Sequence, residues 1–450
     1  MTDLSAATPP LQPISETPSL GRLTAVAARV GCLSFGGPAG QIALMHREFV
    51  DERGWIDERK YLDALNFCHL LPGPEAQQLA TYIGWRLHGV AGGLIAGGLF
   101  VLPGALVMVA LTIAYAAAAG IGWFAAMFLG VKAAVIAIVV QALLRIAGRA
   151  LTTPFKRGVA GAAFVALFVF ALPFPLVVLG SAVLGWIVAR RRPGWLGSAG
   201  HGADGGGRPA QATGALVWRT VVTVLLWAVI WAAPLVLVLA TLGPDHVLAR
   251  TGLFFSQLAV VTFGGAYAVL AYMAQEAVQT HGWLAAGEMA DGLGLAETTP
   301  GPLILVTQFV GHLAAMRAPA PFAPIVAGLL GAGMTLWVTF APCFLSIFAL
   351  APWIERLRAS DRLRGALSTL TAAVVGVIGN LTMWFALHVL FARVDMVRAG
   401  PVAMQWPDLA SFDWRAAVLA VLAAILLFRT RLGVVGTLAL AALGGLLLAA

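Results

Sequence analysis

Two copies of a Pro-Gly-Pro tripeptide are the residues of this sequence best suited to bind an anion. They comprise Pro72, Gly73, Pro74, Pro300, Gly301 and Pro302. Proline is favoured in the first turn of a helix, so each tripeptide predicts that a helix begins there. The free N–H groups and the positive dipole end of a helix start attract anions, and the Thr299 hydroxyl adds a donor. Each tripeptide can also be a kink that serves packing alone; we favour the anion site because the motif is duplicated.

Polar side chains inside long apolar segments are the next candidates for holding an anion. Lys132 lies near the middle of the apolar run 121–144, and Arg29 precedes a glycine-rich motif. Ionisable groups in such segments are costly, which makes them functional candidates by default. The Lys132 ammonium can either balance a bound anion or pair with a buried carboxylate. Gln141 and Asn380, also in apolar segments, suit ligand lining and interhelical hydrogen bonding equally.

Acidic residues near the same motifs are candidates for carrying protons. Glu75 directly follows the first tripeptide, and Glu297 stands shortly before the second. His69 occupies the place before the first tripeptide that Glu297 occupies before the second. Glu48 and Glu276 are also spaced alike from the two tripeptides. We expect these five residues to include the proton-coupling groups.

The composition places these residues in a membrane. Of 450 residues, 60% are hydrophobic and 11% are charged, and the mean hydropathy is +0.89. Soluble domains carry about 25% charged residues, so this chain needs lipid as its solvent. A helix crosses the hydrocarbon core with about 20 apolar residues; we therefore expect an all-α polytopic membrane protein with roughly 10–13 membrane segments. The net charge of +8 indicates cytoplasmic loops and no nucleic-acid partner.

The cysteines and the N-terminus suggest no further chemistry. Cys32, Cys68 and Cys343 lie far apart, with no spacing that indicates a disulfide framework or a metal site. We expect no metal and no cofactor. Residues 1–20, rich in proline, serine and threonine, predict a disordered N-terminal tail.

The chain contains an internal repeat. Without gaps, residues 35–74 and 263–302 share 14 identities in 40 positions at an offset of 228. The matches include tryptophan, glutamate and aspartate, which shared apolar composition does not explain. Asp63 and Asp291 match as well, and we expect them mainly to cap the N-termini of helices. The sequence predicts five segments: a tail at 1–20, a first repeat at 21–189, a glycine-rich cytoplasmic linker at 190–214, a second repeat at 215–392 and C-terminal membrane segments at 393–450.

Basic residues are distributed as in a pair of inverted repeats. Residues 46–60 hold four lysines and arginines, whereas the matching 275–291 hold none. The bias reverses at the next connection, where 114–122 hold none and 352–364 hold four. By the positive-inside rule, matching loops then face opposite sides of the membrane. Inverted repeats of this kind are common in secondary transporters.

The Phe-Gly-Gly strings at 35–37 and 263–265 indicate discontinuous or re-entrant helices. Topology requires 23–45 and 252–274 to enter and leave the membrane on one side. The glycines can end one half-helix and start another, and such breaks point to binding sites. An unbroken tilted helix with a glycine packing face is the equal alternative. The glycine candidates for substrate binding are Gly36, Gly37, Gly264 and Gly265.

These motifs together resemble the chromate ion transporter family, in its long-chain form with two domains. The resemblance is carried over about residues 20–392 by the strings Phe35-Gly36-Gly37-Pro38, Gly54-Trp55, Leu71-Pro72-Gly73-Pro74-Glu75 and Phe100-Val101-Leu102-Pro103-Gly104 and by the second-half copies. The second copy departs from the first at Ala266 and Leu303, where the first has Pro38 and Glu75.

The resemblance implies a protein of the bacterial inner membrane, and the basic residues at 46–60 predict that the N-terminus lies in the cytoplasm. The protein would export chromate, driven by the proton-motive force, and so confer chromate resistance. Nothing in the sequence distinguishes chromate from sulfate or another oxyanion, and a sulfate permease working in the import direction is the alternative. An intramembrane enzyme acting on lipid-linked phosphates is a weaker alternative, because the acidic loop residues are interleaved with basic ones. We expect a lipid bilayer and an oxyanion as partners and leave open a homodimer.

Overall fold

The computed structural model describes residues 17–35, 37–69, 71–118, 121–197, 214–262, 266–354, 361–430 and 432–449. Most of these residues, 83%, are helical, which confirms the expected all-α membrane class. The FGG glycines Gly36, Gly264 and Gly265 lie outside the described residues. Their neighbours nevertheless show a break: α1 (Leu20–Leu33) ends before the first string, and α2 (Gly37–His46) begins within it.

The first half of the chain continues through short polar elements into long apolar helices. These are η1 (Arg47–Asp51), α3 (Glu58–Cys68), α4 (Glu75–Ala118), α5 (Gly122–Ala150), α6 (Pro154–Phe168), α7 (Phe174–Arg191) and η2 (Pro193–Leu196). The helix α4 is two helices in one, because His88 and Gly89 leave helical geometry. Residues before and after this reversal pack closely at Gly84 and Gly92. The first part of α4 is therefore a half-helix that folds back on the second part.

The second half repeats this order after an added helix, α8 (Gly214–Leu242). Its elements are α9 (Val247–Val261), α10 (Ala266–Gln275), η3 (Glu276–Thr280), α11 (Ala286–Thr298), η4 (Leu303–Leu305), α12 (Val306–Arg317), α13 (Pro324–Leu350), η5 (Ala351–Trp353) and α15 (Asp361–Leu390). The π-helical turn η1 has its counterpart in η3. The short half-helix α12 folds back on the long helix α13, as the two parts of α4 do.

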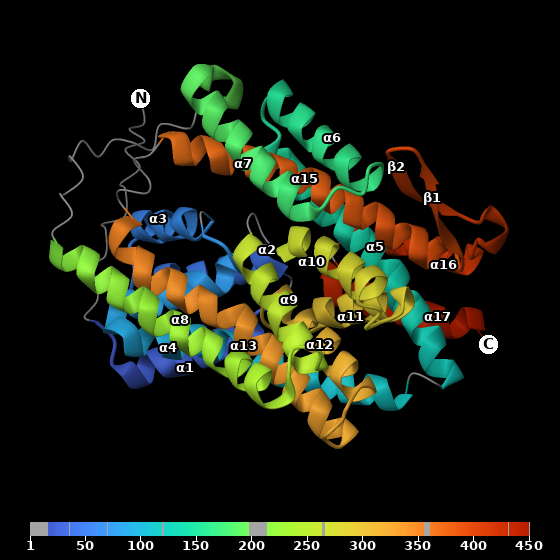
Figure 1. The fold of residues 1–450 in the computed structure, drawn as a ribbon, viewed down its shortest axis with the longest axis horizontal. Helices are drawn as coiled ribbons and strands as arrows, with labels where there is room; N and C mark the ends of the chain where they lie inside the picture. Colours follow the sequence, from blue (N-terminus) through green and yellow to red (C-terminus); the bar gives the residue numbers. More distant parts are fainter. Residues whose placement is uncertain are drawn as a thin grey trace, which may run out of the picture.

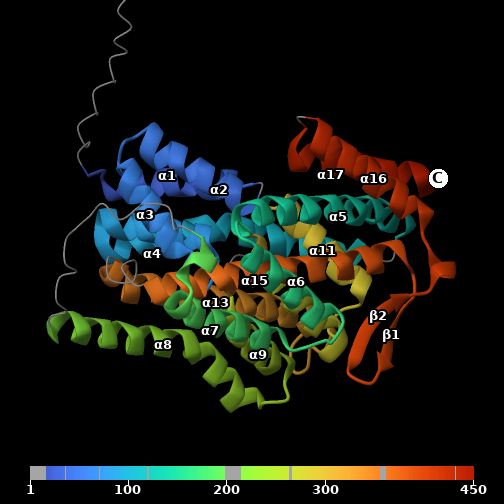
Figure 2. The same ribbon diagram turned by 90° about the horizontal axis from the view of Figure 1, so that it is seen from above.

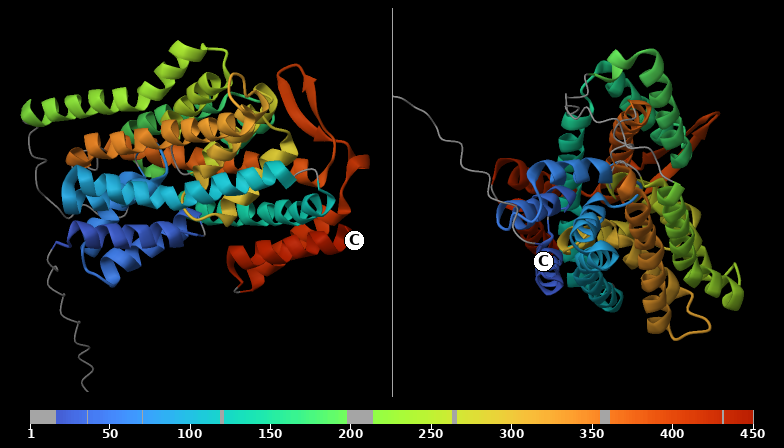
Figure 3. Two further views of the ribbon diagram at one scale, coloured as in Figure 1. Left: turned by 90° about the horizontal axis from the view of Figure 1, so that it is seen from below. Right: turned by 90° about the vertical axis from the view of Figure 1, so that its left-hand side faces the viewer.

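The chain ends in a small β-hairpin and two helices. The strands β1 (Val394–Ala399) and β2 (Val402–Pro407) pair antiparallel, followed by η6 (Leu409–Ser411), α16 (Trp414–Arg429) and α17 (Gly433–Ala449). The hairpin projects from one end of the helical body (Figure 3). The sequence interpretation assigned this stretch to membrane segments and did not anticipate strands.

Helices from the two halves interlock around α5 and α15. The last helices of the first half, α6 and α7, pack on α15 of the second half, and α16 and α17 pack on α5 of the first (Figure 1). One buried core runs through both halves, from Leu23 in α1 to Leu438 in α17. The two halves therefore fold as one body.

Within the described residues, six helices are long and apolar enough to cross a membrane: α4, α5, α7, α8, the helix Pro324–Trp353 and α15. Three further apolar helices in the described residues are shorter than the length needed to cross a membrane: Val247–Val261, Leu303–Arg317 and Gly433–Leu448. Several segments are short because proline and glycine interrupt them, as in the α6–α7 hairpin around Pro173. The helix α8 lies at the outer edge of the body, with almost all of its side chains at least partly exposed (Figure 2).

Candidate functional site

Two reciprocal backbone hydrogen bonds tie the tripeptide of each half to the broken helix of the other. The Gly73 N–H donates to the carbonyl oxygen of Thr262 at 2.7 Å, and the Gly301 N–H donates to that of Ser34 at 2.9 Å. Ser34 follows α1 and Thr262 follows α9, each directly before an FGG string. We call the group formed by Ser34, Gln41, Gly73, Thr262 and Gly301 the PGP junction.

The PGP junction is buried and rich in polar atoms. The Gln41 amide nitrogen donates to the carbonyl of Gly301 at 2.6 Å. The hydroxyls of Ser34 and Thr262 each donate to a carbonyl one turn back, both at 2.6 Å. These side chains are at most 3% exposed. Buried polar groups are costly unless paired. Of these three side-chain bonds, the one from Gln41 crosses between the halves and supports the backbone pairing there.

The junction glycines have backbone geometries that other residues rarely adopt. Gly73 has a φ of 117° and Gly301 a φ of 86°. A Cβ on Gly73 would lie 2.7 Å from the Cys343 Sγ, and one on Gly301 would lie 3.2 Å from the Leu305 Cδ1. Each tripeptide thus needs glycine for its conformation, and Gly73 also for its contact with α13.

Each tripeptide starts a helix, as the sequence predicted. Directly after Pro74, α4 begins at Glu75. Pro302 precedes η4, which continues into α12. The first N–H groups of a helix have no partner within it and remain available to a ligand. The Thr299 hydroxyl is engaged elsewhere, because it donates to the Ala296 carbonyl at 3.0 Å.

Two amide side chains at the start of α4 have unpaired oxygens. The Gln78 Nε2 donates to the Pro72 carbonyl at 2.6 Å, and the Gln77 Nε2 donates to Thr81 at 3.0 Å. The Oε1 atoms of both residues accept no hydrogen bond from any residue that the structure describes. A buried amide oxygen without a donor is unfavourable. These two atoms therefore mark a place where water or a protonated ligand improves the hydrogen bonding.

Lys132 pairs with a buried carboxylate, which is one of its two predicted alternatives. Its Nζ lies 3.3 Å from the Asp291 Oδ1, and the Tyr115 hydroxyl donates to the other carboxylate oxygen at 2.7 Å. The expectation that Asp63 and Asp291 cap helices is wrong, because both lie inside helices, α3 and α11. The cap of α3 is Asp57, whose side chain accepts from two backbone N–H groups.

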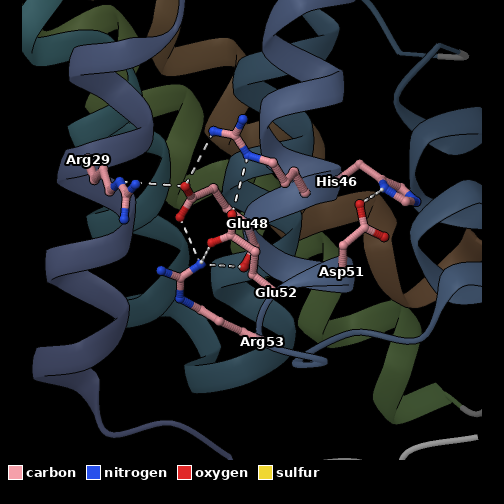
Figure 4. A network of polar contacts seen from close by, with 7 residues as sticks. Arg29, His46, Glu48, Asp51, Glu52 and Arg53 are labelled. Carbon is pink, nitrogen blue, oxygen red and sulfur yellow. Dashed lines mark hydrogen bonds and ion pairs between the residues drawn. The ribbon is translucent and has the colours of Figure 1, made fainter.

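Glu48 lies among three arginines (Figure 4). Its side chain is fully buried, and its carboxylate oxygens lie 2.8 Å from Arg53, 3.6 Å from Arg29 and 3.8 Å from Arg47. Arg29, predicted to bind substrate, thus contacts Glu48 in this structure. The half-exposed Glu276 has no arginine at the matching positions, where Gln257, Gln275 and His281 stand.

The remaining candidates are spread over the molecule. Glu75 is 8% exposed and Glu297 6%, whereas His69 is exposed beyond the end of α3. The Gln141 side chain accepts a hydrogen bond from Arg145 on its own helix. Asn380 lines a small cavity beside the β-hairpin. No hydrogen bond joins Gln141 and Asn380 among the contacts of the described residues.

His46, Asp51 and Glu58 form a polar cluster at the end of α2, outside the membrane-spanning helices. The His46 Nδ1 lies 3.1 Å from Asp51, and its Nε2 lies 2.5 Å from Glu58. Partial burial lowers the pKa of His46, but the two carboxylates outweigh it, so that this pKa is raised above 6.5. The three side chains are close enough to hold a metal ion. However, the two ring nitrogens of His46 face different carboxylates. Without rearrangement, a single metal ion would bind only one of these two nitrogens.

Sequence reasoning missed Ser34, Gln41 and Thr262. Ser34 and Thr262 stand at the repeat offset of 228 directly before the FGG strings, so the repeat itself carried a signal for them. Gln41 has no polar counterpart, because Val269 stands at the matching position. Only the fold shows that it reaches the other half.

Broken helices that meet at a buried polar junction inside an apolar bundle are typical of secondary transporters. The chain belongs to the chromate transporter family, whose model matches residues 21–186 and 249–447.

Several curated proteins are similar over most of the chain. The chromate transport protein of Pseudomonas aeruginosa is 33% identical over 382 residues, which cover 83% of this chain and 82% of that protein. The chromate transport protein of Cupriavidus metallidurans is 29% identical over 371 residues, covering 80% and 81%. The probable chromate transport protein of Synechococcus elongatus is 28% identical over 363 residues, covering 80% and 83%. No solved structure matches the chain.

Proposed function

We propose that this chain exports chromate from the cytoplasm across a bacterial inner membrane and so confers chromate resistance. Its membership of the family and the names of its relatives support chromate as the substrate. We place the N-terminus in the cytoplasm, on the side to which the positive-inside rule assigns residues 46–60. The sulfate permease working inward is the competing proposal, and the experiment below separates the two.

The observation that carries the proposal is the reciprocal pairing of Gly73 with Thr262 and Gly301 with Ser34. Each half contributes a tripeptide to one of these two buried contacts and a helix end to the other. We propose that the halves, 21–189 and 215–392, are inverted in the membrane and rock against each other about this junction. Two halves related in this way can expose one central site to either side in turn.

We propose that the oxyanion binds at the helix starts after the two tripeptides. Chromate is a tetrahedral dianion, and the free N–H groups at the beginning of α4 supply donors and a positive dipole end. The corresponding start after Pro302 supplies a second set. We leave Lys132 out of the direct ligand set, because Asp291 already neutralises its charge.

The electrical part of the proton-motive force favours export of such an ion. Moving one elementary charge through 100 mV corresponds to about 2.3 kcal/mol, so an inside-negative potential drives a dianion outward with about 4.6 kcal/mol. Glu75 lies in the first turn of α4, where an ionised carboxylate would repel the oxyanion. We therefore propose that Glu75 takes up a proton from the cytoplasm before the anion binds and releases it on the outer side with the anion. One net negative charge then leaves per cycle, so the potential contributes about 2.3 kcal/mol per 100 mV to the complete cycle. We assign Glu297 as the second proton-carrying candidate, because it is equally buried next to the second tripeptide.

Transport into everted vesicles tests this proposal, because uptake there corresponds to export from the cell. Labelled chromate should accumulate when the vesicle interior is made electrically positive, and sulfate should compete only weakly. The Glu75→Gln variant, which cannot ionise, should keep chromate uptake but lose its dependence on pH. Accumulation of chromate only in right-side-out vesicles, or sulfate competition at equal concentration, would favour the sulfate permease.

A further inference from the structure

The hairpin of α6 and α7 carries an apolar groove at the surface of the helical body. The groove has a volume of about 530 Å³ and is lined by α6, by α7 and by Ala373 of α15. Its lining includes Phe155 and Ala166 at its two ends on α6. Eleven residues of helix separate these ends, which corresponds to a length of about 17 Å. One leaflet of the hydrocarbon core is about 15 Å deep, so the groove matches the depth of a single leaflet.

A cluster of basic side chains stands at one end of this groove. The helix α6 starts with Lys156 and Arg157 in its first turn, and α7 ends with Arg190 and Arg191, followed by Arg192. The two helices form a hairpin, so the start of α6 and the end of α7 lie at the same end. The lining of the groove itself contains no charged residue, so the basic side chains stand beside the groove and not within it.

Aromatic contacts connect this basic end to the groove itself. The Arg192 guanidinium lies 4.8 Å from the Trp195 ring centroid, and the Trp195 ring lies 5.7 Å from that of Phe155, which lines the groove. The Thr153 hydroxyl donates to the Trp195 carbonyl at 2.8 Å and holds η2 against the start of α6. Through its contact with Trp195, the Arg192 side chain lies at the end of the groove that Phe155 lines.

The charges at the mouth have no acidic partners in the part of the chain that the structure describes. Lys156 is 9% exposed, and its ammonium donates to the Thr152 hydroxyl at 3.2 Å. No carboxylate is among the described contacts of Lys156. Arg190, Arg191 and Arg192 are exposed, and none of them pairs with a described carboxylate. An apolar groove of one-leaflet depth, with cations at its mouth that pair with no described carboxylate, is complementary to one class of molecule.

We propose that this groove binds one anionic phospholipid, with an acyl chain along α6 and α7 and the headgroup phosphate at Lys156, Arg157 and Arg190–Arg192. Basic pockets beside membrane helices on the cytoplasmic side recognise anionic headgroups, and each cation near the surface contributes about 1 kcal/mol. The inference is independent of the proposed transport function, because the groove lies apart from the PGP junction.

Two glycines allow the groove to be filled without disturbing the fold. Gly158 and Gly180 both line the groove, and an added Cβ on either one would meet no atom within 4 Å. The variants Gly158→Phe and Gly180→Phe therefore place a ring where the acyl chain would lie. Gly161→Phe is the matched control, because Gly161 is equally open and on the same helix but does not line the groove.

Native mass spectrometry of the purified full-length chain measures the binding directly. Phosphatidylglycerol and phosphatidylcholine with identical acyl chains serve as probes. The unaltered chain and Gly161→Phe should retain one phosphatidylglycerol at least tenfold more tightly than phosphatidylcholine, and Gly158→Phe and Gly180→Phe should lose it. Replacing Arg190, Arg191 and Arg192 by glutamine should weaken the binding of phosphatidylglycerol roughly hundredfold and reduce its preference over phosphatidylcholine.

Two results would overturn the proposal. Equal retention of both lipids by the unaltered chain would show that the basic mouth does not select a headgroup. A dimer in the unaltered chain that becomes a monomer in Gly158→Phe, with lipid retention unchanged, would show that a second copy of this chain occupies the groove. Unchanged melting temperatures of the phenylalanine variants confirm that loss of lipid does not reflect unfolding.

Discussion

The Lys132 ammonium lies 3.3 Å from the carboxylate of Asp291 and joins α5 of the first half to α11 of the second. The carboxylate is further held by the Tyr115 hydroxyl, which comes from α4. Two consecutive helices of the first half, α4 and α5, therefore meet α11 of the second half at one charge pair. Since the Asp291 side chain is only 9% exposed, its charge depends on this pair for compensation.

Breaking this pair from one side should destabilise the protein more than removing both charges. Lys132→Met leaves a buried carboxylate without its cation, which we expect to cost about 3 kcal/mol. The double variant Lys132→Met with Asp291→Asn should recover most of that loss. Thermal unfolding in detergent, arranged as a double-mutant cycle, measures the coupling. Additive losses in the two single variants would show that the two side chains do not depend on each other.

The same double variant tests whether Lys132 binds the substrate. If the pair is structural, the double variant should keep chromate transport once its stability is restored. A stable double variant without transport would return Lys132 to the group of ligand candidates.

The junction glycines should not tolerate a side chain. Gly73→Ala combines an unfavourable φ of 117° with an approach of 2.7 Å to the Cys343 Sγ, so we expect it to cost about 1–3 kcal/mol and to abolish chromate transport. Gly301→Ala should behave similarly through its φ of 86°. Gly54→Ala is the control, because Gly54 also has a positive φ, of 58°, but no atom within 4 Å of the added Cβ.

Chromate efflux from cells, normalised to the amount of protein in the membrane, checks this prediction. Gly54→Ala should retain transport at near the unaltered level. If Gly73→Ala and Gly301→Ala transport as well as Gly54→Ala does, the reciprocal hydrogen bonds have no role in the transport cycle.

The sequence predicted those parts of the site whose conformation depends on neighbouring residues in the chain, and missed contacts between residues far apart in the chain. Proline restricts its own backbone, so the start of α4 after Pro74 could be predicted from neighbouring residues alone. The partner of Lys132 could not, because Asp291 comes from another element and its sequence context resembled a helix cap. Likewise, Arg47 and Arg53 were counted as signals of membrane topology, whereas the structure shows them around Glu48. The hairpin 394–407 was missed because its apolar residues had been assigned to a membrane segment.

Glu48 and Glu276 match in the repeat but should differ in their effects on stability. Glu48→Gln removes the charge that three arginines contact, and we expect it to cost about 1.5–3 kcal/mol. Glu276→Gln should change stability little, because no ion pair involves Glu276 within the described residues. Melting temperatures of the two variants give the comparison. Equal losses would mean that both glutamates have the same structural role.

The cluster around His46 should make stability depend on pH above the ordinary histidine range. Because Glu58 and Asp51 raise the pKa of His46 in the folded protein, protonation stabilises the folded state. This contribution is fully present below the unfolded pKa of about 6.5 and is lost as the pH rises through the higher folded value. As the pH rises above about 6.5, the melting temperature of the unaltered chain should therefore fall by more than that of His46→Gln. The variants Asp51→Asn and Glu58→Gln should each reduce the difference, because each removes one carboxylate that favours the charged ring. If His46→Gln shows the same fall as the unaltered chain, the dependence arises from another group and the two carboxylates do not stabilise the imidazolium.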